Sequence, residues 1–71
     1  MSEQVEITYE VKGTRHLLNV NVNLNDFYKW SPMRKHRHFH TIGVKTYGKN
    51  AELISVIVKQ TGEEIYAKSE I

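Results

Sequence analysis

The feature that most constrains the fold is a strict alternation of apolar and polar side chains near the start of the chain. Along residues 5–11, Val, Ile and Tyr occupy every second position, with Glu or Thr between them. A period of two with these residue types is typical of a strand that buries one face. Residues 18–24 repeat the pattern with Asn at each odd position. Residues 12–14 supply a turn in which Gly accepts a positive φ without steric cost. The pattern therefore predicts an antiparallel hairpin.

Three further strands are predicted downstream. The third strand of the chain covers about residues 38–47, where alternate side chains lie on opposite faces. Residues 51–59 form the most apolar stretch. Helix is possible at its Ala-Glu-Leu start, but Ile and Val in near succession favour a strand that is buried on both faces. A Thr-Gly turn signal then precedes a last strand over residues 65–71.

A long segment connects the second and third predicted strands. Asn25 or Asp26 can cap a short helical turn. Because Pro32 disfavours helix at Ser31, that turn would end there. Alternatively, the Ser-Pro pair opens a second helical turn, with Ser as the N-cap and Pro at the first helical position. In either case residues 25–37 are a long connection, of a kind that is more often functional or mobile than merely connective.

These elements predict one small domain over residues 1–71. A chain of this length buries only about 60% of its unfolded surface. The expected fold is mainly β, with about five antiparallel strands in a small, partly open barrel or bent sheet. A long basic loop or a short helical turn would separate strands two and three. The alternative is an α+β fold, in which one short helix from residues 25–37 packs on the sheet.

Composition limits the compartment and the means of bracing the fold. The chain contains no cysteine, so neither disulfides nor thiolate-bound metal can stabilise it. No apolar run approaches the ~20 residues needed to span a bilayer. The acidic start at residues 1–6 lacks the basic and apolar regions of a signal peptide. These features predict a cytoplasmic protein without membrane association.

Charge is strongly segregated along the chain. No Asp or Glu occurs between Asp26 and Glu52, whereas six basic residues do, so this segment has a formal charge of +6. The rest of the chain carries four basic residues against all eight acids, a formal −4, and the two parts sum to the net +2. A nearly neutral average therefore hides a basic middle between acidic ends. The six basic residues are Lys29, Arg34, Lys35, Arg37, Lys45 and Lys49.

The basic middle predicts an anionic partner, and nucleic acid is the leading candidate. Clustered Lys and Arg bind phosphates with salt-sensitive, largely sequence-independent affinity. Unpaired bases of DNA or RNA stack on exposed aromatic rings, at about 1–3 kcal/mol each. The competing role for Trp30 is to fill the core at the end of the barrel. The candidate contacts within segment 28–49 are Tyr28, Lys29, Trp30, Arg34, Lys35, His36, Arg37, His38, Phe39, Lys45, Tyr47 and Lys49.

The alternative function is a protein-interaction module or inhibitor that binds an acidic patch on a partner protein. It would use the same residues, since Trp, Tyr and Arg are enriched among interface anchors. An exposed edge, such as the last predicted strand, can also accept a partner strand. The protein is expected to be a monomer or a homodimer that pairs through an edge strand.

Metal binding and catalysis are not predicted. His36, His38 and His40 would share one face of a strand, but no acid or cysteine accompanies them, and structural zinc normally has four ligands. The only Ser in a predicted loop, Ser31, precedes Pro32 and has no obvious acid partner. Glu63 and Glu64 are adjacent and would point to opposite faces of a strand. The four Gly residues are scattered and form no phosphate loop. We expect no cofactor, no metal and no enzymatic activity.

Overall fold

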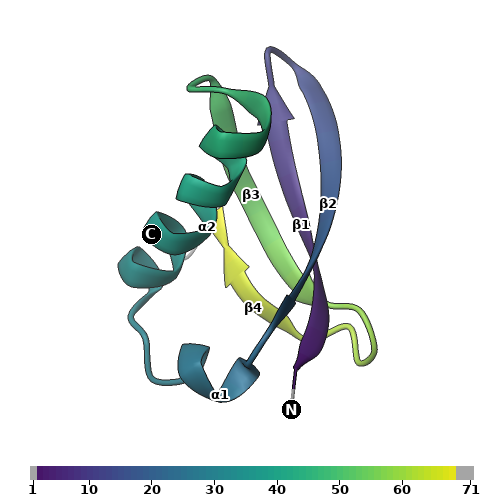
Figure 1. Cartoon of the computed structure of the whole chain (residues 1–71), viewed down its shortest axis with the longest axis vertical. Helices are drawn as coiled ribbons and strands as arrows, with labels where there is room; N and C mark the ends of the chain where they lie inside the picture. The colour runs from purple at the N-terminus through teal and green to yellow at the C-terminus, as the bar shows by residue number, and fades with distance from the viewer. Residues whose placement is uncertain (1, 69–71) are drawn as a thin grey trace.

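The computed structural model describes residues 2–68, which form an antiparallel sheet with two helices between its second and third strands (Figure 1). The spatial order of the strands is β2-β1-β3-β4, so β2 and β4 form the two edges. Each neighbouring pair is antiparallel. In chain order the elements are β1 (Glu3–Val11), β2 (Thr14–Val22), α1 (Leu24–Phe27), α2 (Pro32–Tyr47), β3 (Ala51–Val58) and β4 (Glu64–Ala67).

The predicted hairpin is confirmed as β1 and β2. Their register runs without a shift from Glu3 opposite Val22 to Val11 opposite Thr14. The turn between them has positive φ at residues 12 and 13, 52° and 83°. Two positive φ angles in a two-residue loop match the right-handed twist of the flanking strands. The odd-numbered side chains of β1 point into the core, where Val5, Ile7 and Tyr9 are fully buried.

The predicted third strand is wrong, because residues 38–47 belong to α2. The helix begins as the Ser-Pro alternative describes: the Ser31 hydroxyl accepts a hydrogen bond from the Arg34 N–H at 3.2 Å, and Pro32 opens the first turn. Residues 25–37 are therefore not a long loop, since they contain most of α1 and the first turn and a half of α2. The β-branched residues are accommodated within the helix, where the hydroxyls of Thr41 and Thr46 donate to the carbonyls four residues earlier.

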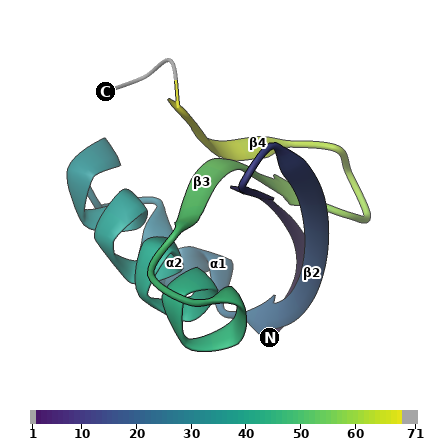
Figure 2. The same ribbon diagram turned by 90° about the horizontal axis from the view of Figure 1, so that it is seen from above.

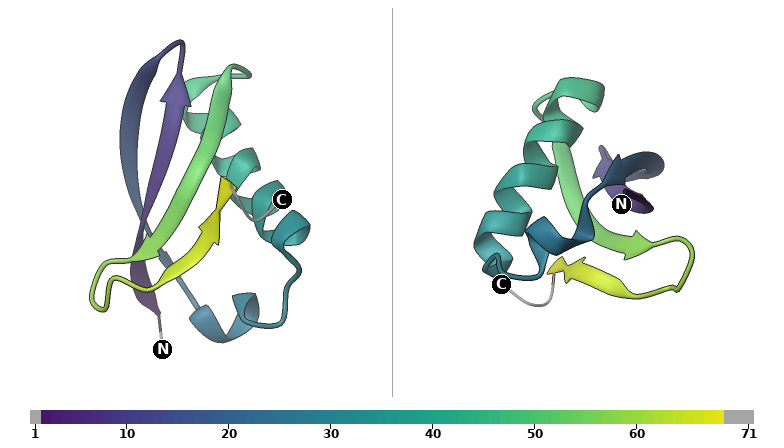
Figure 3. Two further views of the ribbon diagram at one scale, coloured as in Figure 1. Left: turned by 180° about the vertical axis from the view of Figure 1, so that it is seen from behind. Right: turned by 60° about the horizontal axis from the view of Figure 1, so that its bottom comes forward.

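α2 lies across one face of the sheet, mainly over β3 (Figures 1 and 3). We call this the inner face and the opposite one the outer face. Phe39 and Gly43, one helical turn apart, are the buried residues of α2. Between them fits the ring of Tyr9 from β1, whose hydroxyl donates a hydrogen bond to the Phe39 carbonyl oxygen at 2.5 Å. Burial of this helical stripe outweighs the weak helix propensity of its β-branched residues.

β3 is a strand as predicted, but it is not buried on both faces. The register places Tyr9 opposite Leu53 and Thr8 opposite Ser55, so Ile54 is an extra residue at a bulge. The bulge changes which of the alternating side chains face the core. Leu53 before the bulge and Val56 after it are therefore both buried. Ile54 is only partly buried. Viewed from above, neither helix covers the outer face (Figure 2).

The architecture is thus a small α+β fold with four described strands rather than about five. It is an open sheet and not a barrel, because β2 and β4 do not pair with each other. The alternative with a helix on the sheet is the closer prediction, although that helix spans residues 32–47 and is longer than expected. β4 corresponds to the first part of the predicted last strand, and residues 69–71 of that prediction lie outside the described residues.

Candidate functional site

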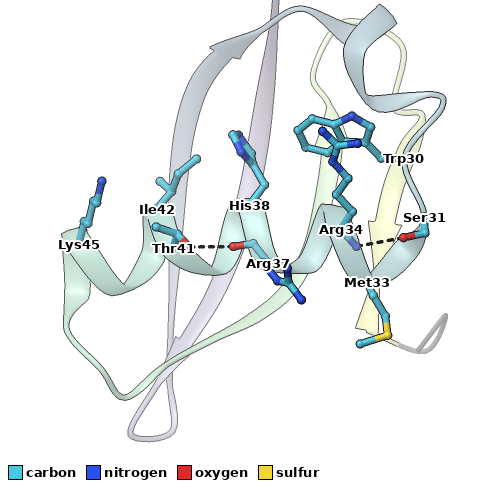
Figure 4. Close-up of a pocket in the computed structure, with 9 residues that line it drawn as sticks. All are labelled: Trp30, Ser31, Met33, Arg34, Arg37, His38, Thr41, Ile42 and Lys45. Atoms are coloured by element: carbon cyan, nitrogen blue, oxygen red, sulfur yellow. Dashed lines mark hydrogen bonds between the residues drawn. The ribbon is translucent and has the colours of Figure 1, made fainter.

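Basic and polar side chains form a stripe along the solvent-facing side of α2 (Figure 4). A helix turns by 3.6 residues, so side chains at spacings of three and four lie above one another. The stripe is exposed along its whole length, and the rise from Arg34 to Lys45 is about 16 Å. We call it the basic stripe; its members are Arg34, Arg37, His38, Thr41 and Lys45.

A groove of about 710 Å³ runs along the basic stripe. Trp30 closes one end of it and Lys45 lies at the other (Figure 4). Cationic, hydroxyl and apolar side chains therefore share one surface. The lining residues are Trp30, Ser31, Met33, Arg34, Arg37, His38, Thr41, Ile42 and Lys45.

Trp30 belongs both to the core and to the groove. Its ring meets Phe27 edge-on at 4.7 Å between centroids, and Phe27 is buried. The guanidinium carbon of Arg34 lies 4.2 Å from the centroid of the indole ring, a cation–π contact (Figure 4). Such contacts are worth about 0.5–1 kcal/mol at exposed sites. The ring of His38 packs edge-on against the indole at 5.4 Å. The indole is thus held in place and still borders the groove.

The two faces of the molecule differ in charge. Within residues 2–68 the only ion pair joins Lys68 to Glu52, so no described carboxylate pairs with a cation of the basic stripe. α2 contains no acid. Glu6 and Glu10 alternate with the buried residues of β1 and therefore lie on the outer face, where Glu10 is opposite Glu52 in the register. Positive charge without carboxylates is thus concentrated over α2, whereas the opposite side of the sheet carries both signs, since Arg15 is opposite Glu10 and Lys68 pairs with Glu52.

Three of the four predicted Tyr, Trp and Phe contacts do not line the groove. Phe39 has no exposed surface and is part of the core, so its ring cannot stack on a ligand in this conformation. Tyr28 is 53% exposed, but its hydroxyl donates a hydrogen bond to Glu63 Oε1 at 3.0 Å, toward the β3–β4 turn. Tyr47 is partly buried, and its ring packs against those of Tyr9 and His16 at 5.5 and 4.8 Å.

The strand interpretation required His36, His38 and His40 to share one face, but in the structure they do not. His36 and His40 stack one helical turn apart, with ring centroids 5.3 Å apart, and the His36 ring lies 5.8 Å from that of Tyr66 on β4. His38 points instead toward Trp30. Burial, followed by the charge of His40, lowers the pKa of His36, and burial lowers the pKa of His38. Among the described residues, no group of three or more His, Cys, Asp or Glu could hold a metal ion.

The remaining predicted residues flank the basic stripe. Lys29 is exposed just before α2 and Lys49 just after it, whereas Lys35 is partly buried. Sequence reasoning missed four residues of the groove, two of them because a strand was assumed over residues 38–47. Read from Arg34 with helical spacing, positions 38, 41 and 45 would have identified the stripe. The four missed residues are Ser31, Met33, Thr41 and Ile42.

Comparisons of the chain with protein-family models, with curated proteins and with solved structures found no match. No helix in residues 2–68 has the length and apolar character needed to cross a membrane. The chemistry of the site therefore rests on its own residues. Unpaired cations beside an indole and an open groove suit an anionic ligand that also carries planar groups.

Proposed function

We propose that this protein binds nucleic acid through the basic stripe, mainly at phosphates and largely independently of sequence. The observation that carries the proposal is the exposure of Arg34, Arg37 and Lys45 on an acid-free helix, without a described carboxylate partner. Unpaired Lys and Arg release counterions when they neutralise phosphates, which is the main source of sequence-independent affinity. The stripe is about 16 Å long, close to the rise of about five base pairs of B-DNA.

The groove supports an additional contact with an unpaired base. Base–aromatic stacking contributes about 1–3 kcal/mol per base and tolerates any sequence. A base stacks on Trp30 if the guanidinium of Arg34 swings aside, or on the outer plane of the guanidinium if it stays. His38 adds an imidazole at the same place. Because this contact needs an unstacked base, it favours single strands over duplexes.

The test measures the binding of fluorescein-labelled single-stranded DNA, duplex DNA and RNA by anisotropy over a range of salt concentrations. The variant is the triple substitution Arg34→Gln, Arg37→Gln and Lys45→Gln. The slope of log K against log salt changes by about 0.9 per phosphate contact for a duplex and about 0.7 for a single strand. If all three contacts are lost, the slope should become shallower by about 2.7 for duplex DNA or about 2.1 for single strands.

A matched control removes the same charge elsewhere. Lys12→Gln, Arg15→Gln and Lys59→Gln together also take away three cations, all of them exposed and outside α2. This control should keep a slope close to that of the unchanged protein. If the two triple variants had equal effects, the binding would depend only on net charge, and the basic stripe would be refuted as the contact. Failure of the unchanged protein to bind any of the three nucleic acids would refute the proposed function itself.

The second candidate function is binding to an acidic patch on a partner protein. The observation that favours it is Met33, which is 65% exposed, lines the groove and projects to the same side of α2 as Arg37 (Figure 4). Met, Arg and Trp are enriched at protein interfaces. Met33→Ser separates the two functions, because phosphate-dominated binding should not depend on this side chain, whereas an interface anchored by it should weaken.

A further inference from the structure

β2 leaves a long strand edge unpaired. It is an edge strand of nine residues, and no described strand pairs with its outer side (Figure 1). Its backbone is extended throughout, since its register with β1 is continuous over all nine pairs. Such an edge presents a row of free N–H and C=O groups, which is a template for another strand.

The usual protections of an edge strand are missing from β2. Edge strands are commonly protected by Pro, by a bulge, by inward-pointing charge or by being short. β2 contains no Pro and no bulge, and its one Lys or Arg is Arg15, near its start. The described part of β4, at the other edge, has four residues and a register shift against β3 at Val56 and Ile57. The two edges therefore differ, and β2 is the one open to pairing.

The inner side chains of β2 are incompletely covered. Leu18 is opposite Ile7 and Val20 is opposite Val5, so both point to the face that holds the core. Ile7 and Val5 are fully buried, whereas Leu18 and Val20 are only partly buried. The cause is the position of α2, which covers β3 and β1 rather than the edge. A further strand beside β2 would bring apolar neighbours to these two side chains.

We propose that β2 pairs antiparallel with β2 of a second copy of this chain, forming a two-fold symmetric dimer with one continuous sheet. Pairing centred on Leu18 would place it opposite its own copy. It would also set Leu17 opposite Asn19, and Arg15 opposite Asn21. No like charges meet in this register, and the apolar residues of the inner faces adjoin one another. The same patch on both copies is the isologous contact that a two-fold axis requires.

This geometry has a consequence for the basic stripe. An in-plane pairing has its two-fold axis perpendicular to the sheet, so the α2 helices of both copies lie on the same face of the shared sheet. If the proposed function holds, two stripes then contact one nucleic acid together, and the second contact is strengthened by effective concentration. The pairing itself depends only on β2, so dimerisation and nucleic-acid binding can fail independently.

The test is sedimentation equilibrium at about 0.15 M salt, where the Debye length is about 8 Å and attraction between distant opposite charges is screened. The unchanged protein should show a concentration-dependent dimer. The double variant Leu17→Lys and Asn19→Lys places lysines opposite one another near the axis, and we expect its dimer Kd to rise by about tenfold or more. Leu17 is 60% exposed and Asn19 is also exposed, so the monomer fold should persist, which circular dichroism checks.

The matched control is Asn50→Lys with Gln60→Lys, which adds the same charge at exposed turn positions away from β2. It should dimerise like the unchanged protein. Because the chain has no native cysteine, Asn19→Cys allows a second test by cross-linking through a single introduced thiol. A short bis-maleimide should link it into a covalent dimer, and it should leave Gln60→Cys monomeric. A monomer at all concentrations, equal dimers of the two double-lysine variants, or cross-linking only at position 60 would overturn the proposal.

Discussion

At Gly43 the backbone of α2 lies directly against the ring of Tyr9. A Cβ atom added there would lie 2.7 Å from Cδ1 and 2.8 Å from Cζ of Tyr9, and closer still to Cε1, whereas ordinary contacts begin at 3.4 Å. The ring has no free space to move into, because Tyr9 is fully buried and its hydroxyl is bonded to the Phe39 carbonyl. Gly43→Ala therefore forces the helix or the ring to shift.

Two effects of Gly43→Ala have opposite signs. Ala favours a helix interior over Gly by about 1 kcal/mol. Overpacking a buried site costs about 1–3 kcal/mol, and loss of the Tyr9 hydrogen bond adds about 1 kcal/mol if the ring moves. Contact with three ring atoms places the penalty near the upper end, so we expect a net loss of about 2 kcal/mol. For a domain of this size, that corresponds to a Tm lower by about 8–16 °C.

Urea unfolding followed by circular dichroism and by Trp30 fluorescence measures the change. The control is the same substitution in a Tyr9→Leu background, where the clashing ring is absent. There Gly43→Ala should be neutral or stabilising, so the two substitutions should show strong coupling in a double-mutant cycle. If Gly43→Ala alone stabilised the protein by about 1 kcal/mol, helix propensity would dominate and the packing argument would be refuted.

Two further predictions concern α2. Ser31→Ala removes the cap on the Arg34 N–H and should lower the free energy of unfolding by about 1 kcal/mol in urea titrations, while Ser31→Asp should retain most of it. Stability should also depend on pH, because the pKa of His36 is lower in the folded protein than in the unfolded chain. As pH falls, the unfolded chain therefore binds a proton at a higher pH than the folded protein does, which favours unfolding. Stability should be full above about pH 6.5 and should fall as pH drops toward the lowered pKa. His36→Gln should reduce this dependence, and an unchanged urea midpoint from about pH 7.5 to about pH 5.5 in the original protein would contradict it.

The candidate site was predictable in part, because charge is visible in sequence without knowledge of the fold. The acid-free interval between Asp26 and Glu52 identified the basic residues. Only the helix shows which of them share a surface. It places Arg34, Arg37 and Lys45 on one stripe and turns His36 toward β4.

By itself, the sequence determined the features that depend on near neighbours in the chain. The β1–β2 hairpin follows from its alternation and its Gly turn. The Ser31-Pro32 pair predicted a helix start at the position where α2 begins, as one of two alternatives. In each case the residues that decide the conformation are adjacent in the sequence, so tertiary contacts are not needed to explain it.

Only the tertiary structure decided the conformation of residues 38–47 and the phase of β3. Local preferences there are nearly balanced, since Thr41, Ile42 and Val44 suit a strand while Ser31 and Pro32 start a helix. The helix wins because it alone buries Phe39 and lets Gly43 meet the ring of Tyr9, which is distant in the sequence. Because the burial of α2 depends on a distant strand, the hydrophobic periodicity of residues 38–47 is too weak to identify the helix from the sequence alone.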